Sequence, residues 1–190
     1  MKIAISGSAG TGKTTLATAL AAKRGCSFVA ENFDNFFDDN AAFIKPARRL
    51  QQRIIATLEQ KDAIENDCGD FVADRCAIDL FNLWLSLGYG VSQKKTAELY
   101  NRCRAYITKY DRIVILPWGA LPLTQVEPAV GRRRRVMNRW HQLFNHSTMV
   151  GLLQQWVDPS RVTMVPFEMT EIDARVKFVL RSLKPIQSDH

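Results

Sequence analysis

The stretch of residues 7–14 constrains this chain more than any other feature. Its sequence, GSAGTGKT, matches the pattern G-x-x-x-x-G-K-[ST], which forms a loop around phosphate groups. The glycines let successive backbone N–H groups turn inward, Lys13 supplies a positive charge for the β- and γ-phosphates, and Thr14 offers a hydroxyl to Mg²⁺. A short apolar run at 3–6 precedes the pattern and helix-forming residues follow it, as this mechanism requires. We therefore expect a P-loop that binds ATP and Mg²⁺ through Gly7, Ser8, Ala9, Gly10, Thr11, Gly12, Lys13, Thr14 and Thr15.

Short apolar runs alternate with longer helical patterns along the rest of the chain. This alternation is typical of an α/β fold with a mostly parallel sheet. We expect one doubly wound domain over residues 1–190. The expected strands are 3–6, 27–30, 71–73, 113–116 and 162–166. The expected helices are 14–24, 47–64, 78–87, 92–109 and 136–156, and a last helix capped by Thr170, with Asp173 at the capping-box position.

The formal net charge of +7 fits a polyanionic partner, and both a nucleoside triphosphate and a nucleic acid meet that description. The 4 cysteines include no C-x-x-C pair, so neither a zinc ribbon nor a thioredoxin-type motif is indicated, and a reducing compartment is expected. The sequence shows no signal-peptide pattern and no apolar run of membrane-spanning length. We expect a cytoplasmic protein without a membrane partner.

Asp74 and Arg75 end the third expected strand. A carboxylate there can hold the Mg²⁺ water shell, and Arg75 can contact phosphate; the alternative is a surface pair beyond a strand end. No acidic residue follows the most apolar strand, 113–116, as a hydrolytic motor ATPase would require. The stretch 108–111, TKYD, resembles a guanine-reading loop but precedes its strand. These observations favour ATP over GTP.

The acidic and aromatic segment 31–39, ENFDNFFDD, follows the second expected strand and is a candidate acceptor side. A small-molecule kinase needs one carboxylate to take the proton of the acceptor hydroxyl and an apolar wall to hold the acceptor. Asp34 and Glu31 are the candidate bases. The alternative is a solvated acidic loop whose phenylalanines fold into the core.

The run Arg132–Arg135 lies in a loop segment, about 118–136, that is rich in proline, glycine and arginine. Arginines on a mobile flap can close over a triphosphate and neutralise charge that develops in the transition state, which makes Arg132 and Arg133 candidate catalytic residues. A nucleic-acid patch and a solvated basic turn are the alternatives.

Taken together, GSAGTGKT, the acidic loop, VADR with Asp79, ILPW and VEPAVGRRRR resemble the nicotinamide riboside kinase-like P-loop ATPases, which are kinase-type AAA domains. The resemblance spans nearly the whole chain. It implies a three-layer sandwich with helices on both faces of a parallel sheet of order 2-3-1-4-5, Asp74 on the strand beside the P-loop strand, and Arg132 and Arg133 as lid arginines. The stretch 34–37, DNFF, is similar to the Asp-x-Phe-Phe of other nucleoside kinases.

Two functional hypotheses follow. The first is an ATP-dependent kinase of a small molecule, such as a nucleoside or nucleotide. Its catalytic residues would be Lys13, Asp74, the base (Asp34 or Glu31) and the lid arginines Arg132 and Arg133. The second is a regulatory or nucleic-acid-associated ATPase with no small acceptor. A closed pocket beside Asp34 would favour the kinase, whereas an arginine stripe that continues onto an open groove would favour nucleic acid.

Overall fold

A parallel sheet of five strands forms the centre of the computed structural model, which describes residues 1–31, 47–123 and 138–183. The strands are β1 (Lys2–Ser6), β2 (Ser27–Val29), β3 (Phe71–Asp74), β4 (Arg112–Ile115) and β5 (Val162–Met164). Their order, β2-β3-β1-β4-β5, confirms the expected topology and makes β1 the central strand. Ala4 of β1 pairs with Ala73 on one side and with Ile113 on the other.

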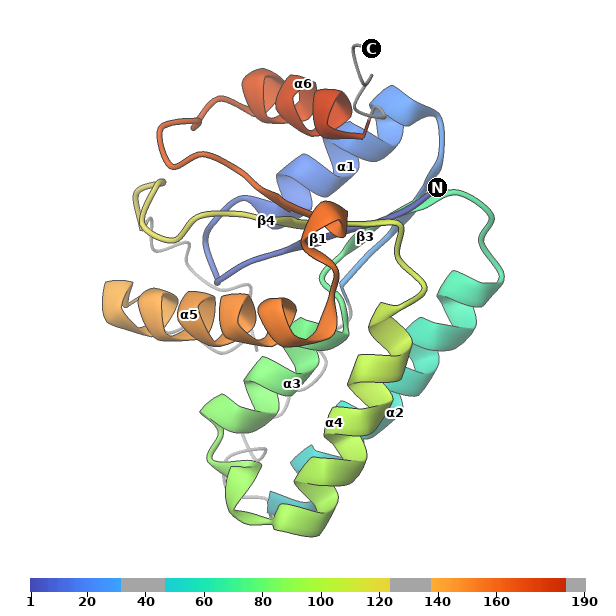
Figure 1. The fold of residues 1–190 in the computed structure, drawn as a ribbon, viewed down its shortest axis with the longest axis vertical. Coiled ribbons are helices and arrows are strands. Elements are labelled where there is room, and N and C mark those ends of the chain that lie inside the picture. Colours follow the sequence, from blue (N-terminus) through green and yellow to red (C-terminus); the bar gives the residue numbers. More distant parts are fainter. Residues whose placement is uncertain (32–46, 124–137, 184–190) are drawn as a thin grey trace, which may run out of the picture.

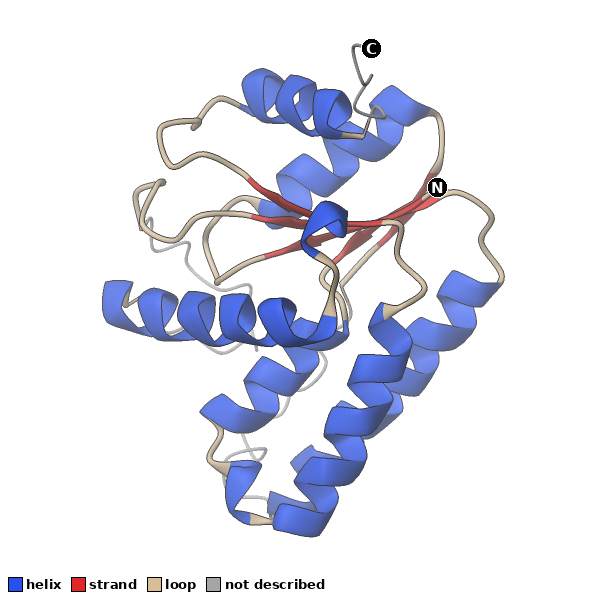
Figure 2. Ribbon diagram, viewed as in Figure 1, coloured by secondary structure: helices blue, strands red, loops and turns tan. Residues whose placement is uncertain are grey.

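Helices cover both faces of the sheet (Figure 1 and Figure 2). One face carries α1 (Lys13–Arg24) and α6 (Ile172–Ser182). The other carries α2 (Ala47–Asn66), α3 (Ala77–Ser86), α4 (Gln93–Ile107) and α5 (Arg139–Trp156). Two short 3₁₀ helices, η3 (Tyr89–Val91) and η4 (Pro159–Arg161), precede α4 and β5.

The strands are apolar on both sides because each sheet face is buried under helices. Ile3 and Ile5 pack into the core beneath α1 and α6, whereas Ala4 packs into the core on the other face. Successive side chains of a strand point to opposite faces, so a short continuous apolar run serves both cores. This packing fixes the ends of the strands, where the candidate site lies.

The expected helices and strands all occur, with ends shifted by a few residues. α1 ends where expected, at Gly25, whose φ of 64° is a left-handed conformation that favours glycine. α5 begins at Arg139, three residues later than expected, because the Asn138 side chain accepts hydrogen bonds from the backbone N–H groups of Trp140 and His141.

The expected cap of α6 was wrong. Its N-cap is Glu171, which makes no side-chain capping bond, and the helix begins at Ile172 rather than directly after Thr170. Asp173 then lies in the first turn, where a negative charge is stabilised by the helix dipole. Among the described helices, none combines the length and the apolar composition that crossing a bilayer requires.

Candidate functional site

The loop between β1 and α1, residues 7–14, is called the phosphate loop below. Gly7 has a φ of 145° and lies against Leu116, whose backbone oxygen would be 3.2 Å from a Cβ added at this position. Gly12 has a φ of 84° and is the N-cap of α1. Only glycine adopts these conformations without strain, so the pattern is explained by backbone geometry. The N-terminus of α1 faces the same loop and favours an anion there.

Lys13 is buried within the phosphate loop. Its Nζ donates a hydrogen bond to the backbone oxygen of Ser8 at 2.7 Å, and Thr11 Oγ1 donates to the same oxygen at 2.9 Å. Burial, together with the positive charge of Arg75, lowers the pKa of Lys13 to about 7. The lysine is therefore held at the loop in a site where its positive charge lacks full compensation.

Thr14, at the start of α1, meets Asp74 at the carboxyl end of β3. Thr14 Oγ1 donates to Asp74 Oδ2 at 2.5 Å, and Asp74 Oδ1 is buried without a hydrogen-bond partner. Burial raises the pKa of Asp74, although the bond from Thr14 opposes the shift. An unsatisfied carboxylate oxygen beside a hydroxyl fits Mg²⁺, which is commonly bound through one or two protein oxygens together with phosphates and water. These are the two residues that were expected to serve the metal.

Arg75 connects the end of β3 to two carboxylates. Its Nε lies 2.6 Å from Glu31 Oε2, and its Nη1 lies 3.1 Å from Asp79 Oδ1. Burial alone would lower the pKa of Arg75, but Glu31 and Asp79 outweigh it and the pKa is raised. Arg75 also has a φ of 65°, which is uncommon for a residue with a side chain and marks a strained turn. Glu31, one of the two candidate bases, is thus held next to Asp74.

Asp79 lies close to the phosphate loop. Its Oδ2 accepts hydrogen bonds from Ser6 Oγ at 2.6 Å and from the backbone N–H of Cys76 at 3.0 Å. The second bond belongs to a capping box at the start of α3, and the spacing of three residues between Cys76 and Asp79 was the available signal. The first bond fixes Asp79 to the end of β1, directly before the loop.

The start of α5 also holds the phosphate loop. Ser8 Oγ donates to the backbone oxygen of Gln142 at 2.7 Å, and Gln142 Nε2 donates to the backbone oxygen of Ala9 at 2.6 Å. No sequence motif indicated this contact, because Gln142 and Ala9 are 133 residues apart. Thr14 and Thr15 remain exposed at the start of α1.

A third group of side chains meets around Gly119, after β4. A Cβ added at Gly119 would lie 3.9 Å from both Arg139 Nε and Phe167 Cε2. The Arg139 guanidinium lies 5.5 Å from the centre of the Trp118 ring, and about half of Phe167 is exposed. Ligands of open parallel sheets bind beyond the carboxyl ends of the strands, where this group lies.

The remaining candidates lie outside the described residues. These are Asp34, Arg132 and Arg133, and with them the features expected to separate a closed acceptor pocket from an open basic groove. Only the start of the expected lid segment, up to residue 123, is described.

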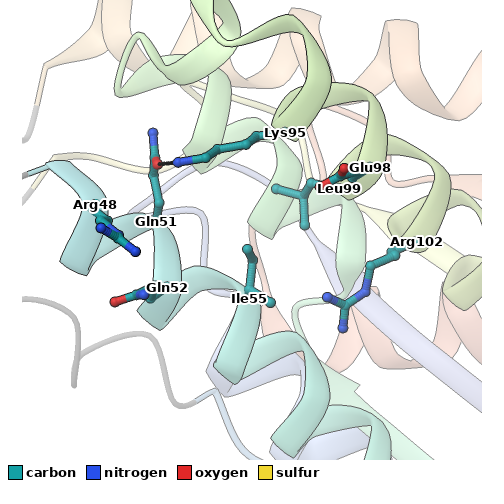
Figure 3. A pocket seen from close by; sticks show the side chains of 8 residues that line it. All are labelled: Arg48, Gln51, Gln52, Ile55, Lys95, Glu98, Leu99 and Arg102. Atoms are coloured by element: carbon teal, nitrogen blue, oxygen red, sulfur yellow. Dashed lines mark hydrogen bonds between the residues drawn. The ribbon is translucent and has the colours of Figure 1, made fainter.

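A separate pocket of about 550 Å³ opens between α2 and α4 (Figure 3). It contains none of the residues of the phosphate loop, so it is distinct from the site built around Lys13. Its lining residues are Arg48, Gln51, Gln52, Ile55, Lys95, Glu98, Leu99 and Arg102.

Solved structures with this fold include several kinases. Deoxyadenosine kinase from M. mycoides with bound dATP is 14% identical over 96% of this chain and 99% of its own, with a TM-score of 0.64. Thymidylate kinase from Candida albicans is also 14% identical, over 95% and 89% of the two chains, with a TM-score of 0.64. NadR protein in complex with NR is 18% identical over 93% of this chain but 51% of its own, with a TM-score of 0.61. At these identities the likeness establishes the fold.

The fold and the phosphate loop together define a P-loop protein, and its fold is shared by solved structures of a deoxyadenosine kinase and a thymidylate kinase. The sequence profile of the AAA domain family matches residues 2–156, and the chain belongs to that family. No curated protein sequence matches the chain. The expected AAA domain is thereby confirmed at the level of the family, and the finer resemblance to nicotinamide riboside kinase-like proteins stays a prediction.

Proposed function

We propose that this protein is an ATP-dependent kinase that transfers the γ-phosphoryl group to a nucleoside or nucleotide. The observation that carries the proposal is the meeting of Lys13, Thr14 and Asp74 at one end of the sheet, with Glu31 held next to them by Arg75. This arrangement offers a cation for the phosphates, two oxygens for Mg²⁺ and a carboxylate for the acceptor.

On the nucleotide side, the backbone N–H groups of the phosphate loop and the Lys13 ammonium would bind the β- and γ-phosphates. Thr14 and Asp74 would hold Mg²⁺, which neutralises charge on the phosphates when it is bound. Phe167 and Arg139, which both approach Gly119, offer a ring and a guanidinium against which a purine base can stack.

On the acceptor side, the carboxylate of Glu31 is the described candidate for the base, and Asp34 is the alternative. In the transfer step the acceptor hydroxyl oxygen forms a bond to the γ-phosphorus while the bond from that phosphorus to the β–γ bridging oxygen breaks. ADP leaves with the bridging oxygen, and the hydroxyl proton passes to the carboxylate. Arg75 would hold the Glu31 side chain in place through their ion pair.

Arg132 and Arg133 are proposed as lid residues that stabilise the transferring group. The acceptor class is supported by the kinases that share this fold, which include a deoxyadenosine kinase, a thymidylate kinase and NadR with bound NR. A nucleoside or nucleotide acceptor, nicotinamide riboside included, is therefore the class to test first.

The test is a panel of nucleosides, nucleotides and nicotinamide riboside, each incubated with the protein, ATP and Mg²⁺ and analysed by mass spectrometry. We expect at least one acceptor to gain the mass of a phosphoryl group, with an equal amount of ADP, and Lys13→Ala to abolish the product. ATP hydrolysis that no acceptor accelerates, together with binding to single-stranded DNA or RNA, would instead support the nucleic-acid-associated ATPase.

A further inference from the structure

Arg175 of α6 is buried directly behind the phosphate loop. Only 2% of the residue is exposed. Its Nη1 donates a hydrogen bond to the backbone oxygen of Thr11 at 2.9 Å, and its Nε donates to the backbone oxygen of Met169 at 2.7 Å. A Cβ added at Gly12 would lie 3.2 Å from Nη1, which shows how closely the guanidinium approaches the loop.

This guanidinium has no acidic partner among the described residues. None of the described ion pairs includes Arg175, and its Nη2 is buried without a hydrogen-bond partner. Arg75, in contrast, lies between the carboxylates of Glu31 and Asp79. An arginine stays protonated in proteins, so Arg175 is a buried charge that two carbonyl dipoles solvate only in part.

Arg175 can polarise the peptide unit between Thr11 and Gly12 through its hydrogen bond to the Thr11 carbonyl. Because the peptide bond between Thr11 and Gly12 is trans, the Gly12 N–H points away from the Thr11 carbonyl that Arg175 binds. A carbonyl that accepts a hydrogen bond polarises its peptide unit and makes the N–H of that unit a stronger donor. The cation therefore strengthens an anion site from behind, without touching the anion.

We propose that the phosphates of the bound nucleotide are the counterion of Arg175, which makes Arg175 a positioning residue for triphosphate binding. The inference rests on the proposed function, because it assigns the phosphate loop to a triphosphate. It accounts for a buried arginine that pairs with no carboxylate of the described segments, at a place where a polyanion is expected. The bond to Met169 also ties the phosphate loop to the segment 165–171, which carries Phe167.

A purely structural role makes a different prediction. Arg175 could serve only to hold Thr11 and Met169 together through its two hydrogen bonds. In that case its removal should lower the melting temperature of the ligand-free protein and leave the triphosphate affinity of the folded protein nearly unchanged. If the charge of Arg175 is instead balanced by a bound triphosphate, then removal of the charge should weaken triphosphate binding. A lysine keeps the charge but lacks the planar guanidinium, and it should restore most of the affinity.

The experiment measures binding of Mg-ATP and of inorganic tripolyphosphate, which lacks a base, by calorimetry. We expect Arg175→Met to weaken both by about tenfold, because a unit charge is lost near a polyanion in a poorly solvated site. Arg175→Lys should regain most of the affinity. Lys177→Met removes the same charge from an exposed position of α6 and should change affinity less than twofold. If the methionine variant does not fold, then Arg175→Gln, which keeps one donor, should show the same loss.

Equal affinities for the Arg175→Met and Lys177→Met variants would overturn the inference, and so would a loss that the lysine does not restore. A loss for ATP but not for tripolyphosphate would also overturn it, since the effect would then lie with the base. Wild-type protein that binds neither probe would contradict the proposed function itself, which is a distinct result.

Discussion

The hydroxyl of Thr14 donates a 2.5 Å hydrogen bond to the carboxylate of Asp74, although the two residues are 60 positions apart in the chain. They meet because β1 and β3 are parallel neighbours, with Ile5 paired with Asp74, so the end of β3 lies beside the loop that leaves β1. The second oxygen of Asp74 stays buried and without a partner. This pair gives the phosphate loop its candidate Mg²⁺ site.

Replacement of Asp74 by asparagine tests that site. Asp74→Asn keeps an oxygen for Thr14 but removes the charge that favours a divalent cation, so we expect turnover at saturating Mg-ATP to fall about 10²-fold. ATP affinity should change much less, because the phosphate loop and Lys13 are intact. Asp67→Asn, at an exposed position after α2, is the matched control. Full Mg²⁺-dependent turnover in Asp74→Asn would place the metal elsewhere.

The lowered pKa of Lys13 predicts that the protein takes up a proton when ATP binds. Burial and Arg75 lower the pKa of the ligand-free lysine to about 7. Phosphates favour the charged form and should raise the pKa on binding. At pH 8 we therefore expect binding to take up most of a proton, and the affinity should fall as pH rises above 7. At pH 6 the lysine is already charged and the uptake should be small.

The measurement is titration calorimetry with Mg-ATP at both pH values, in two buffers of different ionisation enthalpy. The difference between buffers gives the number of protons taken up. An enthalpy at pH 8 that is independent of the buffer would show that Lys13 is charged before ATP binds.

The base is tested by paired substitutions on the acceptor side. With an acceptor identified, Glu31→Gln should lower the transfer rate about 10²-fold or more, since a positioned base contributes at least that much. Background hydrolysis of ATP should be largely spared. Glu98→Gln, at an exposed position of α4, should behave as wild type. If Asp34→Asn shows the loss and Glu31→Gln does not, then Asp34 is the base and Glu31 only orients Arg75.

The arginine run separates a lid from a nucleic-acid surface. In a lid, Arg132→Ala and Arg133→Ala should each reduce the rate at saturating ATP by about 10²-fold, with a smaller change in ATP affinity. Arg104→Ala, at an exposed position of α4, is the control. Unchanged turnover, together with a salt dependence of DNA or RNA binding that is reduced by about one unit per arginine, would contradict the lid and the kinase with it.

The sequence predicted the elements that local patterns determine. The strands were recognisable because a parallel sheet covered on both faces needs continuous apolar runs, such as 3–5 in β1. The phosphate loop was recognisable because its glycines allow the positive φ angles of the turn and because Lys13 binds within the same short segment. Asp74 was found because it ends a strand.

Contacts between distant segments could not be predicted in the same way. Arg175 and Thr11 are 164 residues apart, and Gln142 and Ala9 are 133 apart, so no spacing links them. The hydrogen bond from Ser6 to Asp79 likewise joins two residues that are 73 positions apart. The start of α5 differs from the expected one because the Asn138 side chain caps the helix there, whereas α6 begins at Ile172 without a side-chain capping bond.

The most direct test of the account is the affinity of wild-type protein and Lys13→Ala for Mg-ATP, measured by calorimetry. Lys23→Ala, at an exposed position of α1, is the matched control, and thermal unfolding verifies that each variant is folded. We predict that wild type and Lys23→Ala bind equally, and that Lys13→Ala binds about 10²-fold more weakly or not at all, because a charge-assisted contact to phosphate is lost. Equal affinity in all three proteins would contradict the assignment of residues 7–14 as the ATP phosphate site.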